Sequence, residues 1–151
     1  MASAARRAKL EHRISALEAG VIAGIDHFVL TVASVEATCA FYKRALGIEA
    51  DHFAPGRVAL RLGGQKINLH GRSGRPDLVA RAPTEGAGDF CLLDDRPVEE
   101  IARHLKAQGI TIEVGPVERA GARGPILSIY FRDPDSNLVE VANQLPTKDR
   151  K

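Results

Sequence analysis

The sequence predicts an α+β fold in which two β-α-β-β-β modules form a curved mixed sheet around a concave cup. The chain has 151 residues, which is the length of one ordinary domain. Short apolar, β-branched runs surround two segments of helical periodicity. The two halves also match each other when the first is shifted onto the second. This shift pairs Phe28 with Phe90, Leu30 with Leu92, Ala40 with Ala102 and Gly47 with Gly109. A repeated unit of this size buries its apolar face only by packing on its neighbour.

The first module is predicted from its apolar runs and from the residues that cap its helix. An apolar run over residues 25–32 predicts the first strand. Ser34 is a suitable N-cap for a helix that ends at Leu46, where Gly47 supplies the C-cap. Three further short strands are expected, over residues 49–53, 57–62 and 65–70.

The second module repeats this order. A strand is expected over residues 89–93, followed by a helix over 97–108 with Pro97 in its first turn. Turn-forming residues at 133–137 separate the last two strands. The three closing strands are predicted over residues 111–117, 126–132 and 138–143.

Three segments lie outside the regular elements. Residues 1–22 form a predicted helical extension with apolar positions at helical spacing, and residues 146–151 form a predicted flexible tail. The single domain is therefore expected over residues 23–145. Within it, residues 71–88 form a long loop, and loops of this length in compact domains are often functional.

Composition excludes several classes of protein. The net charge is +2 and the basic residues are scattered, so no stripe is available for nucleic acid. Aromatic residues make up 5% with no Trp, which argues against base stacking. No apolar run has the length of a membrane span, so no membrane partner is expected. Cys39 and Cys91 are too few for a disulfide framework, and we predict a reduced, cytoplasmic chain.

Side-chain alternation assigns the strand faces. The apolar sets that include Leu30, Leu69 and Val141 are expected to face the helices and form the core. The opposite face then carries a potential ligand on each of four strands. These residues are His27, Asn68 with His70, Asp89, and Glu140.

This polar face has the composition of a metal site in a small-molecule pocket. Neutral imidazoles with one or two carboxylates suit Zn, Fe, Ni or Mn. Two His and one carboxylate with open positions is also the ligand set of non-haem Fe(II) oxygenases. These residue types alone do not decide which metal binds or which reaction takes place.

Three segments resemble the vicinal oxygen chelate superfamily, which includes glyoxalases, bleomycin resistance proteins and extradiol dioxygenases. Residues 26–32 are similar to its opening strand, and residues 41–47 to the end of the following helix. Residues 131–140, with the sequence FRDPDSNLVE, resemble its closing hairpin. Residues 66–70 and 80–84 are similar to members of the glyoxalase-domain-containing protein 5 subgroup and its bacterial virulence-associated relatives.

The resemblance implies a cup with one divalent metal ion, held by ligands from the first and last strand of each module. His27 and Glu140 match two ligand positions. Asp89 stands where metal-binding members usually have His, and Asn68 where they often have Glu or Gln. We therefore expect His70 to supply the missing imidazole in a set of His27, His70 and Glu140, with Asp89 near or on the metal. The alternatives are that Asn68 or Asp89 completes the site, or that the metal site has been lost.

The implied function is glyoxalase I-like isomerase or lyase chemistry on a small, oxygen-chelating substrate. Glu140 and Asp89 are the candidate catalytic residues, because a carboxylate near the substrate can move a proton. The alternatives are an extradiol-type dioxygenase and a drug- or metabolite-binding protein without chemistry. A homodimer is expected, with the cup either within one chain or at the dimer interface. The candidate substrate-binding residues are Arg81, Tyr130, Ser128 and Asn68.

Overall fold

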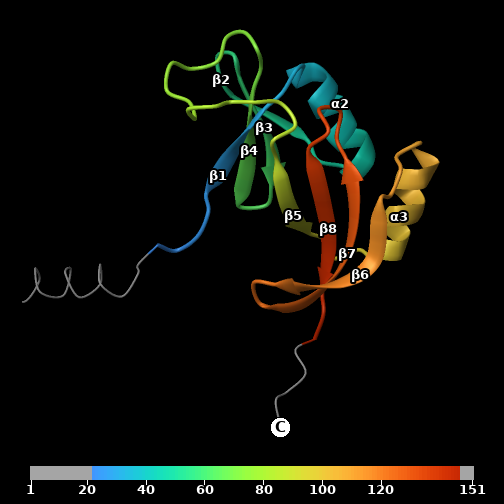
Figure 1. The fold of residues 1–151 in the computed structure, drawn as a ribbon. Helices are drawn as coiled ribbons and strands as arrows, with labels where there is room; N and C mark the ends of the chain where they lie inside the picture. The colour runs from blue at the N-terminus through green and yellow to red at the C-terminus, as the bar shows by residue number, and fades with distance from the viewer. Residues whose placement is uncertain (1–21, 147–151) are drawn as a thin grey trace, which may run out of the picture.

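The computed structural model describes residues 22–146 and contains the two predicted modules. The first module consists of β1 (His27–Thr31), α2 (Val35–Leu46), β2 (Ala50–Ala54), β3 (Arg57–Leu62) and β4 (Gln65–His70). The second consists of β5 (Asp89–Leu93), α3 (Val98–Ala107), β6 (Val114–Gly121), β7 (Gly124–Arg132) and β8 (Leu138–Gln144). Figure 1 shows α2 and α3 on one side of the molecule, and the 71–88 loop arched over the end of β1 and β4.

Each module forms its own four-stranded sheet, with the orders β1-β4-β3-β2 and β5-β8-β7-β6. The first and last strands of each module pair in parallel, and the other neighbours pair antiparallel. The sheets meet where β1 and β5 approach, and the rings of Phe28 and Phe90 lie 5.2 Å apart between centroids. The predicted α+β class and the two repeated modules are confirmed.

One apolar core lies between the sheets and the helices. Its members come from both modules, and the alternation rule predicted the strand residues among them correctly. The fully buried side chains include Val32, Leu60, Ile67, Leu105, Ile129, Phe131, Val139 and Val141. Because these residues share one cluster, neither module buries its apolar face alone.

The first helix is held by its own neighbours in sequence. Ser34 accepts a hydrogen bond from the backbone N–H of Ala37 at 3.1 Å. Gly47 adopts the left-handed backbone conformation with φ of 74°, and its N–H donates to the Lys43 carbonyl. Both predicted caps of α2 are therefore confirmed.

The second helix begins with support from a distant strand. Pro97 precedes α3 and offers no side-chain cap. Instead, Asn143 on β8 accepts a hydrogen bond from the Val98 N–H at 2.9 Å. Its amide nitrogen donates to the carbonyls of Asp94 and Arg96 at 2.6 and 2.8 Å. One side chain on β8 thus fixes the segment that leads into α3.

The turn at residues 133–137 joins the modules. Asp133 is buried and accepts a hydrogen bond from the Tyr42 hydroxyl at 3.0 Å. The Asp133 carboxylate also accepts from the backbone and side-chain nitrogens of Asn137. The Asp135 carboxylate accepts from the Ala33 N–H in the first module at 3.1 Å. Polar contacts therefore hold β1 and α2 against the closing hairpin.

The largest difference from the predicted elements concerns β6. The strand was expected over residues 111–117, but it runs from Val114 to Gly121. It continues because its later residues pair with β7 up to Gly124, which forms a tight hairpin with Gly121. The other predicted strands and both helices lie within a few residues of their expected positions.

The predicted extension and tail lie outside the described residues, apart from Ile22 and Pro146, so the domain limits of 23–145 stay a prediction. Between residues 22 and 146, neither helix is long and apolar enough to cross a membrane.

Candidate functional site

The polar face of the first module contains two buried groups without protein partners. Asn68 and His70 are 5% and 7% exposed, and both lie on β4. The Asn68 Oδ1 and His70 Nε2 atoms have no hydrogen-bond partner among residues 22–146. Buried polar side-chain atoms are nearly always paired in folded proteins. These two buried atoms are therefore left unsatisfied within the described part of one chain.

His70 has the protonation state of a ligand-binding imidazole. Burial lowers the pKa of His70, and the positive charges of Arg57 and Arg75 lower it further. The ring is thus neutral near pH 7 and offers one donor and one acceptor nitrogen.

His27 lies on the same sheet face but in different surroundings. Its side chain is about half exposed, and its Nδ1 atom lies 2.6 Å from the Asp26 carboxylate. The hydrogen bond to His27 lowers the pKa of Asp26. A carboxylate at Nδ1 orients the ring and leaves Nε2 free, as in the carboxylate–histidine pairs of metal sites.

The β1–β4 register separates the two histidines. His27 pairs with Lys66, whereas Thr31 pairs with His70. His27 and His70 therefore lie four residues apart along the strands, which corresponds to an offset of about 13 Å in the strand direction. Side chains on one sheet face stand roughly parallel, so this offset keeps the two rings of one chain apart.

The second module presents a carboxylate that already has a partner. Glu140 on β8 accepts a hydrogen bond from the Ser128 hydroxyl at 2.5 Å. Strand pairing gives Glu140 two neighbours. Cys91 on β5 lies opposite it on one side, and Tyr130 on β7 lies opposite it on the other. Arg119 on β6 lies over the Tyr130 ring, with its guanidinium carbon 5.6 Å from the ring centroid.

The groups around Glu140 keep their protons. Burial raises the pKa of the Cys91 thiol to about 12, and the negative charge of Glu140 adds to the shift. Burial also raises the pKa of Tyr130, helped by its hydrogen bond to Glu140. Cys91 is therefore a thiol rather than a nucleophilic thiolate at neutral pH, and Tyr130 is a hydrogen-bond donor.

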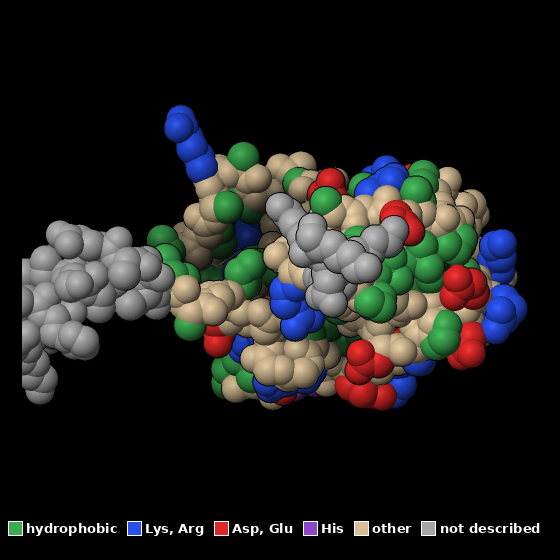
Figure 2. All heavy atoms as spheres, turned by 90° about the horizontal axis from the view of Figure 1, so that it is seen from below, with side chains coloured by type: hydrophobic (Ala, Val, Ile, Leu, Met, Phe, Trp, Pro, Cys, Tyr) green, Lys and Arg blue, Asp and Glu red, His purple; other side chains and the backbone are tan. Residues whose placement is uncertain are grey.

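Two cavities are open to these faces. The larger, of about 790 Å³, lies between β1, β5 and the 71–88 loop, and His27, His70 and Asp89 line it. The smaller, of about 450 Å³, is lined by β5, β6 and β8 residues that include Glu140. Cys91 lines both. Figure 2 shows a hollow on the left of the described surface with hydrophobic side chains around it.

Comparison with known proteins decides the family. The model of the glyoxalase/bleomycin resistance protein/dioxygenase superfamily matches residues 24–141, which span both modules. The chain belongs to this superfamily.

Several relatives share most of the superfamily domain with this chain. Virulence protein STM3117 from Salmonella typhimurium is 44% identical over 81% of this chain and 85% of its own. Its crystal structure has a TM-score of 0.80 and covers 83% of this chain and 99% of that one. Glyoxalase domain-containing protein RDO1 from Mycosarcoma maydis is 41% identical over 84% of this chain and 72% of its own. Lactoylglutathione lyase from Agrobacterium tumefaciens is 29% identical, with a TM-score of 0.62 and coverage of 80% and 93%.

The superfamily domain brings only some of the predicted site residues together. Within the described residues of one chain, no three His, Cys, Asp or Glu side chains lie close enough to hold one metal ion. His27, His70 and Asp89 line the larger cavity, whereas Glu140 lines the smaller one with Tyr130.

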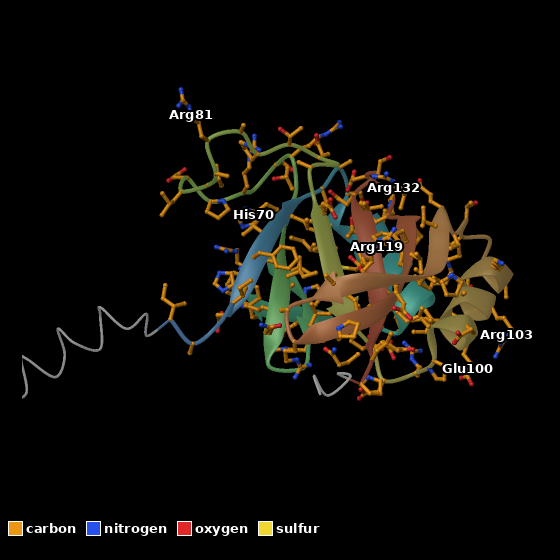
Figure 3. All side chains as sticks on the ribbon, turned by 60° about the horizontal axis from the view of Figure 1, so that its bottom comes forward. His70, Arg81, Glu100, Arg103, Arg119 and Arg132 are labelled. Atoms are coloured by element: carbon orange, nitrogen blue, oxygen red, sulfur yellow. The ribbon has the colours of Figure 1, made fainter. Side chains whose placement is uncertain are left out.

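The predicted substrate-binding residues also differ in their placement. Ser128 is buried against Glu140, and Asn68 is buried on β4. Arg81 does not line either cavity, and its side chain points away from the molecule at the top of the 71–88 loop (Figure 3).

Two residues that contact these side chains were not predicted from the sequence. Asp26 orients His27, and its position next to His27 in the sequence is a signal that was available. Arg119 approaches Tyr130 from β6, but the predicted strand stopped at residue 117. Extending the alternation by two residues places Arg119 on the same face as Val117.

Proposed function

We propose that this chain is a glyoxalase-type isomerase or lyase that acts on a small substrate with adjacent oxygen atoms. The observation that carries the proposal is the pair of unpartnered buried atoms, Asn68 Oδ1 and His70 Nε2. They lie on the sheet face that also presents His27. A fold that only needed stability would leave apolar side chains in those positions, because unpaired buried polar groups are costly.

The proposal includes one divalent metal ion, either Zn, Ni, Mn or Fe. One chain does not fit this group, because its described residues bring no three ligating side chains together. We therefore propose that a second copy completes the site, with His27 of one chain and Glu140 of the other as ligands. The candidates for the third ligand are His70, Asp89 and Asn68.

Exposed apolar side chains favour such a homodimer. Val29 on β1 and Leu93 on β5 are 44% and 52% exposed, and they share the strand faces of His27 and Cys91. Among the described residues, β2 and β6 also leave the outer edge of each sheet without a hydrogen-bonded strand. Paired chains would cover these surfaces.

Glu140 is the candidate proton acceptor, a role that requires its carboxylate to leave the metal ion. The Ser128 hydroxyl fixes one carboxylate oxygen, and the second oxygen can accept a proton from a carbon next to a carbonyl group. Asp89, at the start of β5, is the second candidate for proton transfer. The protonated Tyr130 hydroxyl donates a hydrogen bond to Glu140 and so helps to hold this carboxylate in place.

The surroundings of Cys91 favour proton transfer over covalent catalysis. Its thiol has a pKa of about 12, so little thiolate is present at neutral pH. Cys39 and Cys91 are both free thiols, which supports the proposed location in the reducing cytoplasm.

A binding protein without chemistry is the second candidate. It is favoured by the larger cavity, whose walls are mostly apolar and which lies apart from Glu140. An extradiol-type dioxygenase requires Fe(II) with two histidines and a carboxylate, so a protein that binds Zn²⁺, Ni²⁺ or Mn²⁺ but not Fe²⁺ would exclude it.

The test is a titration of the metal-free protein with Zn²⁺, Ni²⁺, Mn²⁺ and Fe²⁺, combined with light scattering. We expect about one ion per chain and the mass of a dimer. A monomer, or a chain that binds none of the four ions, would overturn the proposal.

A further inference from the structure

The larger cavity is built for a small organic molecule. The 71–88 loop covers it with short and aliphatic side chains, and β1 and β5 form its walls. The apolar lining residues include Phe28, Leu30, Val79, Ala80, Pro83 and Leu92. Cavities of this volume with mostly apolar walls are typical of ligand sites.

The roof of the cavity is held in place. At one end of the loop, Arg72 donates a hydrogen bond to Glu85 at 2.7 Å. At the other end, the Gly88 N–H donates to the Asn137 side chain at 2.7 Å. The loop is therefore fastened to the closing hairpin of the second module, and the cavity exists before a ligand binds.

His70 provides the polar point in this apolar space. It is more than nine-tenths buried, it lines the cavity, and its Nε2 atom has no partner among the described residues. Figure 3 shows His70 below the 71–88 loop. Its distance from His27 along the strands leaves its ring free to contact an organic ligand.

The charges indicate which ligand fits. Among residues 22–146, no arginine lines the cavity, so it offers no fork for a carboxylate or phosphate group. The charged lining residues Asp26, Lys66 and Asp89 include both negative and positive side chains. Arg57 and Arg75 place positive charge near His70, which favours an electron-rich oxygen at that end.

We propose that this cavity binds an uncharged, largely apolar molecule, one carbonyl or hydroxyl oxygen of which hydrogen-bonds to the His70 imidazole. His70 is then the residue that selects the substrate rather than a metal ligand. The inference rests on the proposed function, because it names the substrate class of the same cup.

The test compares three probes of the same ring size: 2-naphthol, naphthalene and 2-naphthoate. Binding is measured by fluorescence titration of the full chain. We expect 2-naphthol to bind about 3–10-fold more tightly than naphthalene, which is the contribution of one neutral hydrogen bond. 2-Naphthoate, which carries a charge into an apolar space, is expected to bind more weakly than 2-naphthol.

Two variants locate the site. His70→Phe keeps a ring but removes the nitrogen, so it should abolish the preference for 2-naphthol over naphthalene. Val79→Ser makes the roof polar and should weaken both probes by the same factor. Arg103→Ala, on the exposed face of α3 and far from the cavity, is the matched control (Figure 3).

Two outcomes would overturn the inference. One is a preference for 2-naphthoate, and the other is equal binding of all probes that neither His70→Phe nor Val79→Ser changes. A metal titration of the same samples separates this inference from the proposed function. Probe selectivity without metal binding would overturn the proposed function alone, and metal binding without selectivity would overturn the inference alone.

Discussion

On β4 of the first module, Asn68 and His70 are buried with unpartnered polar atoms, whereas on β8 of the second module Glu140 accepts a hydrogen bond from Ser128. The two modules share one topology, so the difference lies in the side chains alone. The second module fixes a carboxylate through neighbours in the same sheet. The first leaves two buried polar atoms unpaired within the described residues. On the proposed function, the two modules divide the work of the cup between a face that accepts a ligand and a face that holds an acid–base group.

The largest expected effect comes from removing one candidate ligand from each module. His27→Ala and Glu140→Ala should each lower the affinity for divalent metal by more than about 100-fold. Ser128→Ala, which removes only the partner of Glu140, should lower it by about 10–100-fold. Calorimetric titration measures all three. If Ser128→Ala has the larger effect, the carboxylate is held for structural reasons.

The two helices give a smaller, matched comparison of stability. Asn143→Ala leaves the Asp94 and Arg96 carbonyls and the Val98 N–H without their partner, and should cost about 2–3 kcal/mol. Ser34→Ala removes one local cap from α2 and should cost about 1 kcal/mol. Urea unfolding measures both free energies. Equal losses would show that α3 does not depend on β8.

Part of the loss of folding stability at acid pH should come from His70 in the first module. Burial lowers the pKa of His70, so the unfolded chain binds a proton more readily than the folded one. The stability contribution of neutral His70 is therefore present above pH 6.5 and is lost as the pH falls through the lowered pKa. His70→Gln should lose less stability than the wild type between about pH 7.5 and about pH 5 in urea unfolding. Parallel curves for the two proteins would contradict this assignment.

The smallest effect concerns the turn that joins the modules. Ser136 adopts a left-handed backbone conformation with φ of 70°, which costs a side chain more than it costs glycine. Ser136→Gly should raise the free energy of unfolding by about 0.5 kcal/mol. A loss of stability would mean that contacts of the Ser136 side chain outweigh the backbone strain.

Local signals in the sequence were enough for the elements and the strand faces. Ser34 and Gly47 marked the ends of α2, and alternation placed His70 and Glu140 on the polar faces of their strands. These features depend on residues close in the chain.

The arrangement of the elements relative to one another could not be predicted from such local signals. The offset between His27 and His70 depends on the β1–β4 register, which joins strands far apart in sequence. Asn143 caps α3 across a similarly long separation, and the 71–88 loop has no periodicity that could show Arg81 pointing outward. The predicted ligand set of His27, His70 and Glu140 in one cup stays a prediction, and within one chain these residues lie at different strand positions and line two different cavities.

The most direct test of whether the two modules supply different parts of the site mixes two variants that are each expected to have lost metal binding. His27→Ala and Glu140→Ala proteins are each freed of metal, unfolded together, refolded and assayed for bound metal. If each cup combines the first module of one chain with the second module of its partner, half of the dimers are mixed and one of their two cups is intact. The account predicts recovery of about one quarter of the wild-type metal content. Recovery of none, from a mixture shown to contain mixed dimers, would contradict it.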